Sequence, residues 1–273
     1  MAAKILISHL NPVRLFELAN DNWDYFKTPA WETGQNYCQK WEKTDTIRIH
    51  FAVLDTLSVE ATPTLALHDG CGDFVSGLDV SEIILNAAGY NWYEAVADLS
   101  LITAGKYLLV LGGAVDGATI TFYSEPVEIA ADFENTLLFE YTHDENDFDL
   151  IFVPGSPEPN RTFYFRVEGG FASDGLKPSS KDSMYIDQTH NAQMLSSVPF
   201  DVVTLTIGNG AGVPNWIAQK INRIFSCNSV IINGVAYCKN EGAKMEAVRG
   251  ADYASAGWKV DLVYNQNYSL LID

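Results

Sequence analysis

Apolar and polar residues alternate with a period of two along much of the chain. The alternation is clear in 46–54, 118–125 and 161–169, where every second side chain is apolar. It is typical of β-strands that bury one face and expose the other to water. In 46–54 it predicts that Arg48 and His50 lie on the wet face. Further strands are expected at 5–9, 13–18, 63–67, 106–111, 136–142, 148–153, 200–207 and 258–264.

Turn residues separate these segments at short intervals. Such pairs stand at Asp69-Gly70, Gly112-Gly113, Asp116-Gly117 and Pro154-Gly155. Many short strands with frequent turns are typical of antiparallel sandwiches rather than of alternating strands and helices. The sequence therefore predicts a mainly β protein with antiparallel β-sandwich domains and one short α-helix near the C-terminus.

The length of the chain, 273 residues, allows two domains, and we expect their boundary near residue 130. Residues 1–130 would form an N-terminal β-sandwich in which Pro126 suits an edge or the start of a strand. Residues 131–273 would form a second β-rich domain. Within it, 171–199 is polar and rich in turn residues. We interpret 171–199 as a long surface excursion with only weak strands, of the kind that often carries contacts.

One helix is predicted, over 214–227. Pro214 suits its first position, where the missing N–H costs nothing, and apolar residues recur with helical spacing. The apolar face comprises Ile217, Ile221, Ile224 and Phe225, and the polar side comprises Gln219, Lys220, Asn222 and Arg223. A hairpin over 229–238 follows, because Asn233-Gly234 between two apolar runs favours a type I′ turn with positive φ at both residues.

Three glycines, Gly208, Gly210 and Gly212, lie between a predicted strand and this helix, as glycines do in nucleotide-binding loops. A dinucleotide-binding loop has glycine at its first, third and sixth positions, and the sixth position here is Val213. A phosphate-binding loop needs Gly-Lys followed by Ser or Thr, which is missing. We therefore interpret the glycines as a sharp reversal that leads the chain into a helix covering an open sheet.

The net charge of the chain is −18, from 17 Lys and Arg against 35 Asp and Glu. A surface this negative repels phosphate backbones and anionic headgroups, so nucleic acid and membranes are not expected as partners. No apolar run at the start resembles a secretory leader, and we expect the chain to fold in the cytoplasm. The four cysteines would then be thiols: Cys38, Cys71, Cys227 and Cys238.

Candidate chemistry is sparse. The acidic residues of 143–149 could hold calcium, but a solvated hairpin tip explains them better. Cys227 and Cys238 flank the predicted hairpin and make only a weak zinc case without a second pair. The many carboxylates leave glycosidic hydrolysis open, although no pair stands out. We therefore assign no catalytic, cofactor-binding or metal-binding residue and expect no enzyme.

Aromatic residues cluster in the first half of the chain. They occur at 22–26, Trp31, Tyr37, Trp41 and 90–93. Such a set could stack against a sugar, or it could belong to the core and to protein interfaces, where large rings are most often found. The second interpretation is favoured, because exposed aromatic patches are uncommon.

Several stretches resemble structural proteins of phages and prophages of Bacteroides-type bacteria. They are YCQKWEKTDTIRIHF (37–51), YSEPVEIA (123–130), ENTLLFEYTHDENDFD (134–149), FRVEGG (165–170), DGLKPSSKDSMYIDQTHNAQML (174–195) and GVPNWIAQKINRIFSCNSVIINGVAY (212–237). The similarity is to the distal-tail or baseplate class, whose β-sandwich subunits form rings at the tail tip. No catalytic motif defines that class, so it implies no site residues here.

The resemblance implies a structural subunit of the virion, assembled in the cytoplasm of the bacterial host. Its expected partners are copies of itself in a ring, other tail or hub proteins, and fibres as a further candidate. The sequence leaves ring, hub and fibre-adaptor roles open. Two other functions remain as alternatives: a carbohydrate-binding module that recognises host glycan, and a hydrolase of cell-wall or capsular sugar.

Overall fold

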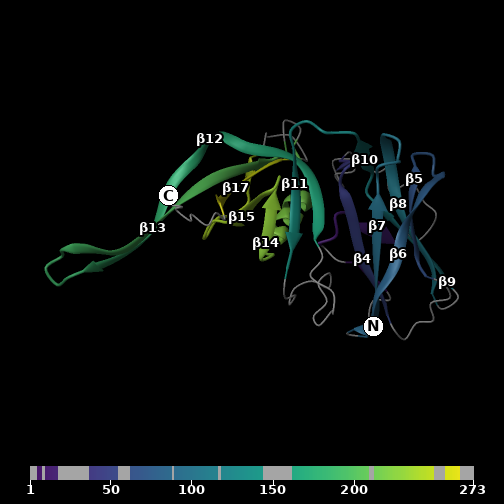
Figure 1. Cartoon of the computed structure of the whole chain (residues 1–273), viewed down its shortest axis with the longest axis horizontal. Coiled ribbons are helices and arrows are strands. Elements are labelled where there is room, and N and C mark those ends of the chain that lie inside the picture. The colour runs from purple at the N-terminus through teal and green to yellow at the C-terminus, as the bar shows by residue number, and fades with distance from the viewer. Residues whose placement is uncertain are drawn as a thin grey trace, which may run out of the picture.

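The computed structural model describes residues 5–7, 10–17, 37–54, 62–87, 89–115, 118–143, 162–208, 212–248 and 256–264. These residues form two β units that lie side by side along the long axis of the molecule (Figure 1). They contain seventeen strands and one short helix, α2 (Asn215–Ile224). The predicted class, mainly antiparallel β with one helix near the C-terminus, is confirmed.

The N-terminal unit is a two-layer sandwich. Its strands are β1 (Ile5–Ile7), β2 (Leu15–Glu17), β3 (Gln39–Glu42), β4 (Thr46–Leu54), β5 (Thr64–Asp69), β6 (Phe74–Ala87), β7 (Tyr90–Asp98), β8 (Gly105–Val115), β9 (Ala118–Ser124) and β10 (Val127–Ala130). The long strand β6 joins the layers, because its first half pairs with β5 and its second half with β7. All pairs are antiparallel except β10 with β3. Both layers contribute to one apolar core, including Ile49, Phe51, Leu67, Leu109 and Ile129.

The second unit closes on itself. Its strands are β11 (Thr136–Thr142), β12 (Phe163–Ile186), β13 (Ala192–Ile207), β14 (Ser229–Ile232), β15 (Val235–Lys239), β16 (Glu246–Val248) and β17 (Gly257–Tyr264). Neighbouring strands follow the order β13-β12-β11-β14-β15-β17, and β17 pairs again with β13. Six strands therefore form a ring, and β16 adds to the edge of β17. The expected strand at 148–153 lies outside the described residues.

The helix contributes to the core of this ring instead of covering an open sheet. Ile217, Ile221 and Ile224 are fully buried among the inward side chains of the strands, as the spacing predicted. The hairpin after the helix is also confirmed, since Ile232 pairs with Val235 and the intervening Asn233 and Gly234 both have positive φ.

Two polar residues that the sequence predicts to be exposed are buried in the structure. His50 is 3% exposed, although its strand β4 was expected to keep that face wet. The second unit packs on this face, and the ring of Phe163 meets His50 edge-on at 4.7 Å. Lys220 was expected on the polar side of the helix but is also buried. Both differences have one cause: two units that look separate in the sequence share an interface.

The stretch interpreted as a surface excursion with only weak strands belongs to one long hairpin. β12 has 24 residues and β13 has 16, and they pair from Gly169 with Ile207 to Ile186 with Ala192. The ladder is interrupted twice, between Phe171 and Leu176 and next to Ser183. Figure 1 shows the outer part of this hairpin projecting from the ring at the end opposite the sandwich.

The glycine loop makes the sharp reversal expected of it. Gly208 and Gly212 have φ values of 86° and 75°, and Gly210 lies outside the described residues. A Cβ on Gly208 would lie 2.9 Å from the amide nitrogen of Val213 and 3.0 Å from the carbonyl oxygen of Ala256. The positions of those two atoms are fixed by a backbone bridge between Val213 and Ala256.

Gly208→Ala is therefore expected to destabilise the protein by about 3 kcal/mol or more, because positive φ and a backbone clash add together. Gly242→Ala is the matched control. Gly242 also has positive φ (74°), but an added Cβ would meet nothing within 4 Å, so only about 1–2 kcal/mol is expected. Urea unfolding of both variants measures the difference, and equal losses would show that the close approach at Gly208 does not matter.

Candidate interaction site

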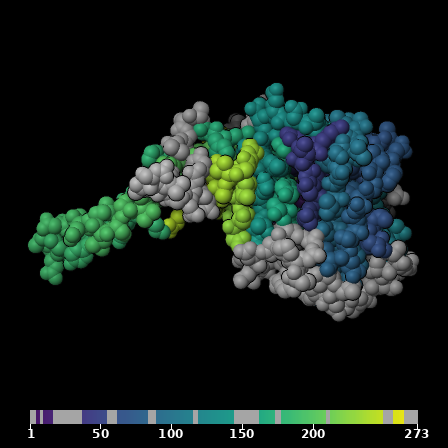
Figure 2. All heavy atoms as spheres, viewed as in Figure 1, coloured from purple at the N-terminus to yellow at the C-terminus, as the bar shows by residue number. Residues whose placement is uncertain are grey.

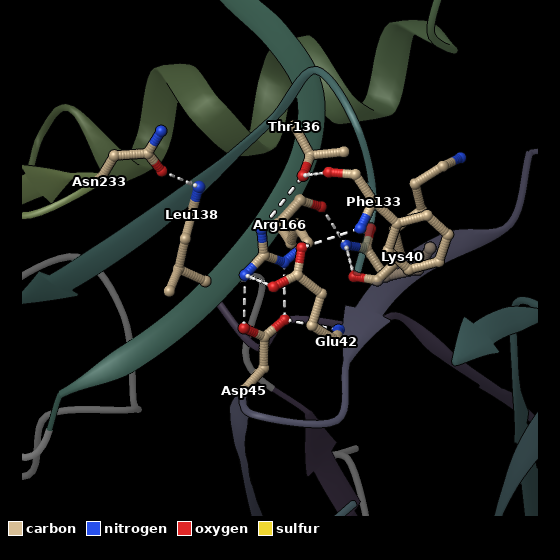
Figure 3. Close-up of polar contacts among 9 residues, drawn as sticks. Lys40, Glu42, Asp45, Phe133, Thr136, Leu138, Arg166 and Asn233 are labelled. Atoms are coloured by element: carbon tan, nitrogen blue, oxygen red, sulfur yellow. Dashed lines mark hydrogen bonds and ion pairs between the residues drawn. The ribbon is translucent and has the colours of Figure 1, made fainter. Parts of the chain in front are cut away.

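A buried arginine joins the two units. Arg166 on β12 donates from Nε to Asp45 Oδ2 at 2.8 Å and from one terminal nitrogen to Asp45 Oδ1 at 2.6 Å (Figure 3). The same nitrogen lies 2.9 Å from Glu42 Oε2, and the other donates to Thr136 Oγ1 at 3.1 Å. The side chains of Arg166 and Asp45 are only 9% and 2% exposed. This bidentate geometry fixes the relative orientation of the two units and also holds them in contact.

A second cluster extends the junction to the helix. Lys220 donates to the carbonyl oxygen of Asn11, and the Asn11 side chain bridges to the backbone of His50 through both its oxygen and its nitrogen. His50 Nε2 lies 3.0 Å from Glu94 Oε2, and that carboxylate also pairs with Arg48. The N-terminal segment thus lies between the sandwich and the ring and is hydrogen-bonded to both.

A third cluster surrounds Glu168 of β12. Tyr37 donates to Glu168 Oε2 at 2.9 Å, and Lys40 pairs with the other oxygen of that carboxylate. Burial, followed by the charge of Glu168, raises the pKa of Tyr37 well above its ordinary value. The phenol therefore stays protonated and keeps its hydrogen bond across the pH range in which the protein is studied. Together the three clusters make the junction a fixed support for the ring and for the hairpin that leaves it.

The outer part of the long hairpin, residues 177–199, is named the arm here. Every residue of the arm is exposed except Asp187, which is half-buried in the turn. In Figure 2 the arm stands clear of the body as a finger, and no described segment covers the face in view. Its side chains therefore bury little surface within the chain.

The tip of the arm is apolar. Six large apolar side chains there are between 53% and 62% exposed: Met184, Tyr185, Ile186, Met194, Leu195 and Val198. Met184 stands opposite Met194 and Ile186 opposite Ala192, so these four share one face of the hairpin, while Tyr185 points to the other. Outside the arm, the exposed large apolar side chains of the described residues are spread over several elements: Phe74, Val75, Leu101, Phe171 and Val248. Exposed apolar groups gathered in this way are typical of interaction surfaces.

The edges of the arm are open as well. Residues 177–186 of β12 pair only with β13, and residues 192–201 of β13 pair only with β12, because β17 begins to pair at Val202. Among the described residues, neither outer edge has a strand partner. Open strand edges with apolar side chains are the standard template for adding a strand from another chain.

The turn at the end of the arm is held by one carboxylate. Asp187 Oδ1 accepts hydrogen bonds from the Thr189 hydroxyl at 2.7 Å and from the Thr189 and Asn191 amides at 2.8 and 2.9 Å. The side-chain bond from Thr189, followed by the backbone bond from Asn191, lowers the pKa of Asp187. His190, with a φ of 65°, completes the reversal. The turn is therefore built locally and does not depend on a partner.

Because the folded pKa of Asp187 is lowered, its contribution to the turn is present above the unfolded pKa and is lost as the pH falls through the folded pKa. In an acid titration followed by NMR, the Thr189 and Asn191 amide signals are expected to move together, with a midpoint below about 3.9, the ordinary aspartate value. A midpoint at or above that value would mean that the carboxylate does not hold the turn. Asp187→Asn should remove the shared transition.

Other residues that the sequence suggested for chemistry are not brought together. The calcium candidate 143–149 lies outside the described residues except for His143. The four cysteines form no disulfide with one another, and burial raises the pKa of Cys38 and of Cys238. The described part of the chain contains no group of three or more His, Cys, Asp or Glu arranged to hold a metal ion. It also contains no helix with the length and apolar character needed to cross a bilayer.

Three of the aromatic residues considered for sugar binding are core residues, and Tyr37 and Tyr90 are half-buried. Trp41, Trp92 and Tyr93 are 1%, 2% and 3% exposed, so none of them can stack against a sugar at the surface. Tyr37 packs edge-on against Trp216 at the junction. Residues 22–26 and Trp31 lie outside the described residues. For the aromatic residues that can be placed, the interpretation as core and interface is confirmed.

Comparisons with protein-family models, with curated proteins and with solved structures find no match to this chain.

Proposed function

We propose that this protein is a structural subunit of a phage tail tip or baseplate. It acts as a ring or adaptor protein between the tail tube or hub and the fibres, and it is held by protein–protein interfaces. Its partners are copies of itself and other tail proteins, and it is assembled in the cytoplasm of the bacterial host. No catalytic step is part of this proposal.

The observation that carries the proposal is the arm. It exposes six large apolar side chains on a hairpin with two open edges. A free chain gains nothing from such a projection, because its apolar surface stays in water. An assembled chain gains the burial of those side chains, which is about 1.5–3 kcal/mol for each one that is fully covered.

The rigid junction supports the same role. A subunit that transmits force along a tail must keep its two halves in one orientation, and a hydrophobic contact alone permits sliding. Two contacts set the relative orientation of the units: the bidentate pair of Arg166 with Asp45 and the bridge from Asn11 to His50. Directional hydrogen bonds restrict rotation more than apolar burial does.

The carbohydrate-binding alternative receives no comparable support. Of the aromatic residues that suggested it, Trp41, Trp92 and Tyr93 are buried, and Tyr37 and Tyr90 are half-buried. The exposed apolar side chains of the arm are mostly Met, Ile, Leu and Val, and these residues lack the flat rings on which sugars stack.

Gold-labelled antibodies against the chain, applied to particles released from bacteria that carry this gene, test the proposal. We expect the gold to lie at the tail tip. Particles that contain no copy of the chain, or that carry it away from the tail, would exclude the proposed role.

A further inference from the structure

A basic hollow lies where the arm leaves the ring. It has a volume of about 560 Å³ and is bounded by the base of the arm on one side and by residues 242–246 and β17 on the other. Its charged and polar walls include Lys177, Thr204, Lys244, Glu246, Lys259 and Asp261. A site with more lysines than carboxylates is notable in a chain whose net charge is −18.

In this hollow both carboxylates have a neighbouring lysine, and one lysine has no carboxylate partner among the described residues. Lys177 donates to Thr204 Oγ1 at 2.8 Å and lies 3.5 Å from Asp261, so Asp261 is already held. Glu246 stands opposite Lys259 in the pairing of β16 with β17. Within the described part of the chain, Lys244 has no carboxylate partner. The hollow therefore offers a positive charge to an acidic group from outside.

A complementary surface lies on β6 of the sandwich. Phe74 and Val75 are 66% and 39% exposed at the start of the strand. Asp79 and Glu82 are exposed further along it, and neither has a cationic partner among the described residues. Each half of β6 has a single strand partner, so each half leaves one edge open in the described structure.

The two surfaces match in length and in the order of their chemistry. Lys177 at the base of the arm and Tyr185 at its tip are eight positions apart, about 26 Å along a strand. Phe74 and Glu82 on β6 are also eight positions apart. Along β12 the surface changes from basic to apolar, and along β6 it changes from apolar to acidic. An antiparallel alignment of arm and β6 thus joins apolar with apolar and basic with acidic.

One molecule cannot make this contact with itself. Figure 1 places the arm at one end of the long axis, and β5 and β6 in the sandwich at the other. We propose that the arm and basic hollow of one copy dock along β6 of a second copy, head to tail. This inference rests on the proposed function and names the surfaces through which that function would operate. A contact between two different surfaces closes into a ring or continues as a filament.

Charge reversal tests the inference. Lys244→Glu with Lys259→Glu alters the hollow, and Asp79→Lys with Glu82→Lys alters β6. We expect each double variant to raise the concentration of half-assembly by at least about tenfold in sedimentation velocity, because like charges then meet. A 1:1 mixture of the two variants should assemble again. When the two variants alternate, each hollow meets a β6 surface of opposite charge.

Asp132→Lys with Glu134→Lys is the matched control. It changes two exposed acids in the same way, outside both surfaces. If only the overall negative charge opposed assembly, this control and the β6 variant would both assemble more readily. The inference predicts that the β6 variant alone assembles less readily.

Three results would overturn the inference while leaving the proposed function to its own test. The unaltered chain could fail to self-associate, the charge variants could assemble as it does, or the mixture could show no recovery. Antibody labelling of particles does not depend on any of them, so the two conclusions can fail separately.

Discussion

A chain carrying Met184→Ser, Ile186→Ser and Met194→Ser is expected to stay monomeric at concentrations where the unaltered chain assembles. These three residues share one face of the arm tip and are 53% to 62% exposed, so their replacement removes only the packing between neighbouring side chains of the hairpin. If a partner buries them fully, their loss costs about 5 kcal/mol or more, which corresponds to a weakening of at least about a thousandfold.

Sedimentation velocity over a range of concentrations measures this effect, and thermal unfolding checks that the monomer is intact. Leu101→Ser is the control, because Leu101 is 93% exposed but lies in the sandwich, away from the arm. The control should assemble as the unaltered chain does. If the arm-tip variant assembles equally well, the arm does not carry the contact.

Arg166→Met is expected to cause the largest loss of stability among single replacements of charged residues. It leaves Asp45 buried without its counter-charge and removes the partner of Glu42. Breaking a buried pair in this way typically costs about 3–5 kcal/mol, since the remaining charge is still withdrawn from water. For a chain of this size the melting temperature should fall by on the order of 10 °C.

Lys181→Met is the matched control for the arginine. Lys181 and Glu241 also form an ion pair, at 3.3 Å, but their side chains are 77% and 86% exposed. An exposed pair contributes about 0–1 kcal/mol, so little change is expected. Combining Arg166→Met with Asp45→Asn and Glu42→Gln should recover part of the loss. No recovery would mean that the arginine acts through packing and not through charge.

Local patterns predicted the elements that pack within one unit. The alternation of Ile47, Ile49 and Phe51 identified β4 and its core face, and the spacing of Ile217 and Ile221 identified the helix. Asn233-Gly234 identified the tight hairpin. In each case the residues that determine the structure lie within a few positions of one another, so a short window contains the whole signal.

Contacts between the units were not predictable in the same way. His50 and Lys220 look like surface residues in their own segments and are buried by chain that is distant in the sequence. The basic hollow likewise combines Lys177, Lys244 and Lys259 from three separate stretches. Short stretches of sequence do not predict this proximity, because it arises from the pairing of β13 with β17, which are far apart in the sequence.

The arm was missed as a hairpin for a different reason. Its strands carry five Ser and two Lys residues, because they cover no core among the described residues and need no apolar face there. A signal was nevertheless present: the apolar residues Met184–Ile186 and Met194–Leu195 flank a turn-forming stretch at 187–191. Residue preferences in strands depend on what the side chains pack against, so strands outside a core need not show an alternating apolar pattern.

The most direct test of this account is hydrogen–deuterium exchange of the backbone amides in the arm, 177–199, compared between dilute monomer and assembled protein. Exchange at the arm is expected to slow by at least about tenfold on assembly, because its open edges and apolar tip become covered. Strands in the core of the ring should change little. Equal exchange at the arm in both states would contradict the claim that the arm is the docking element.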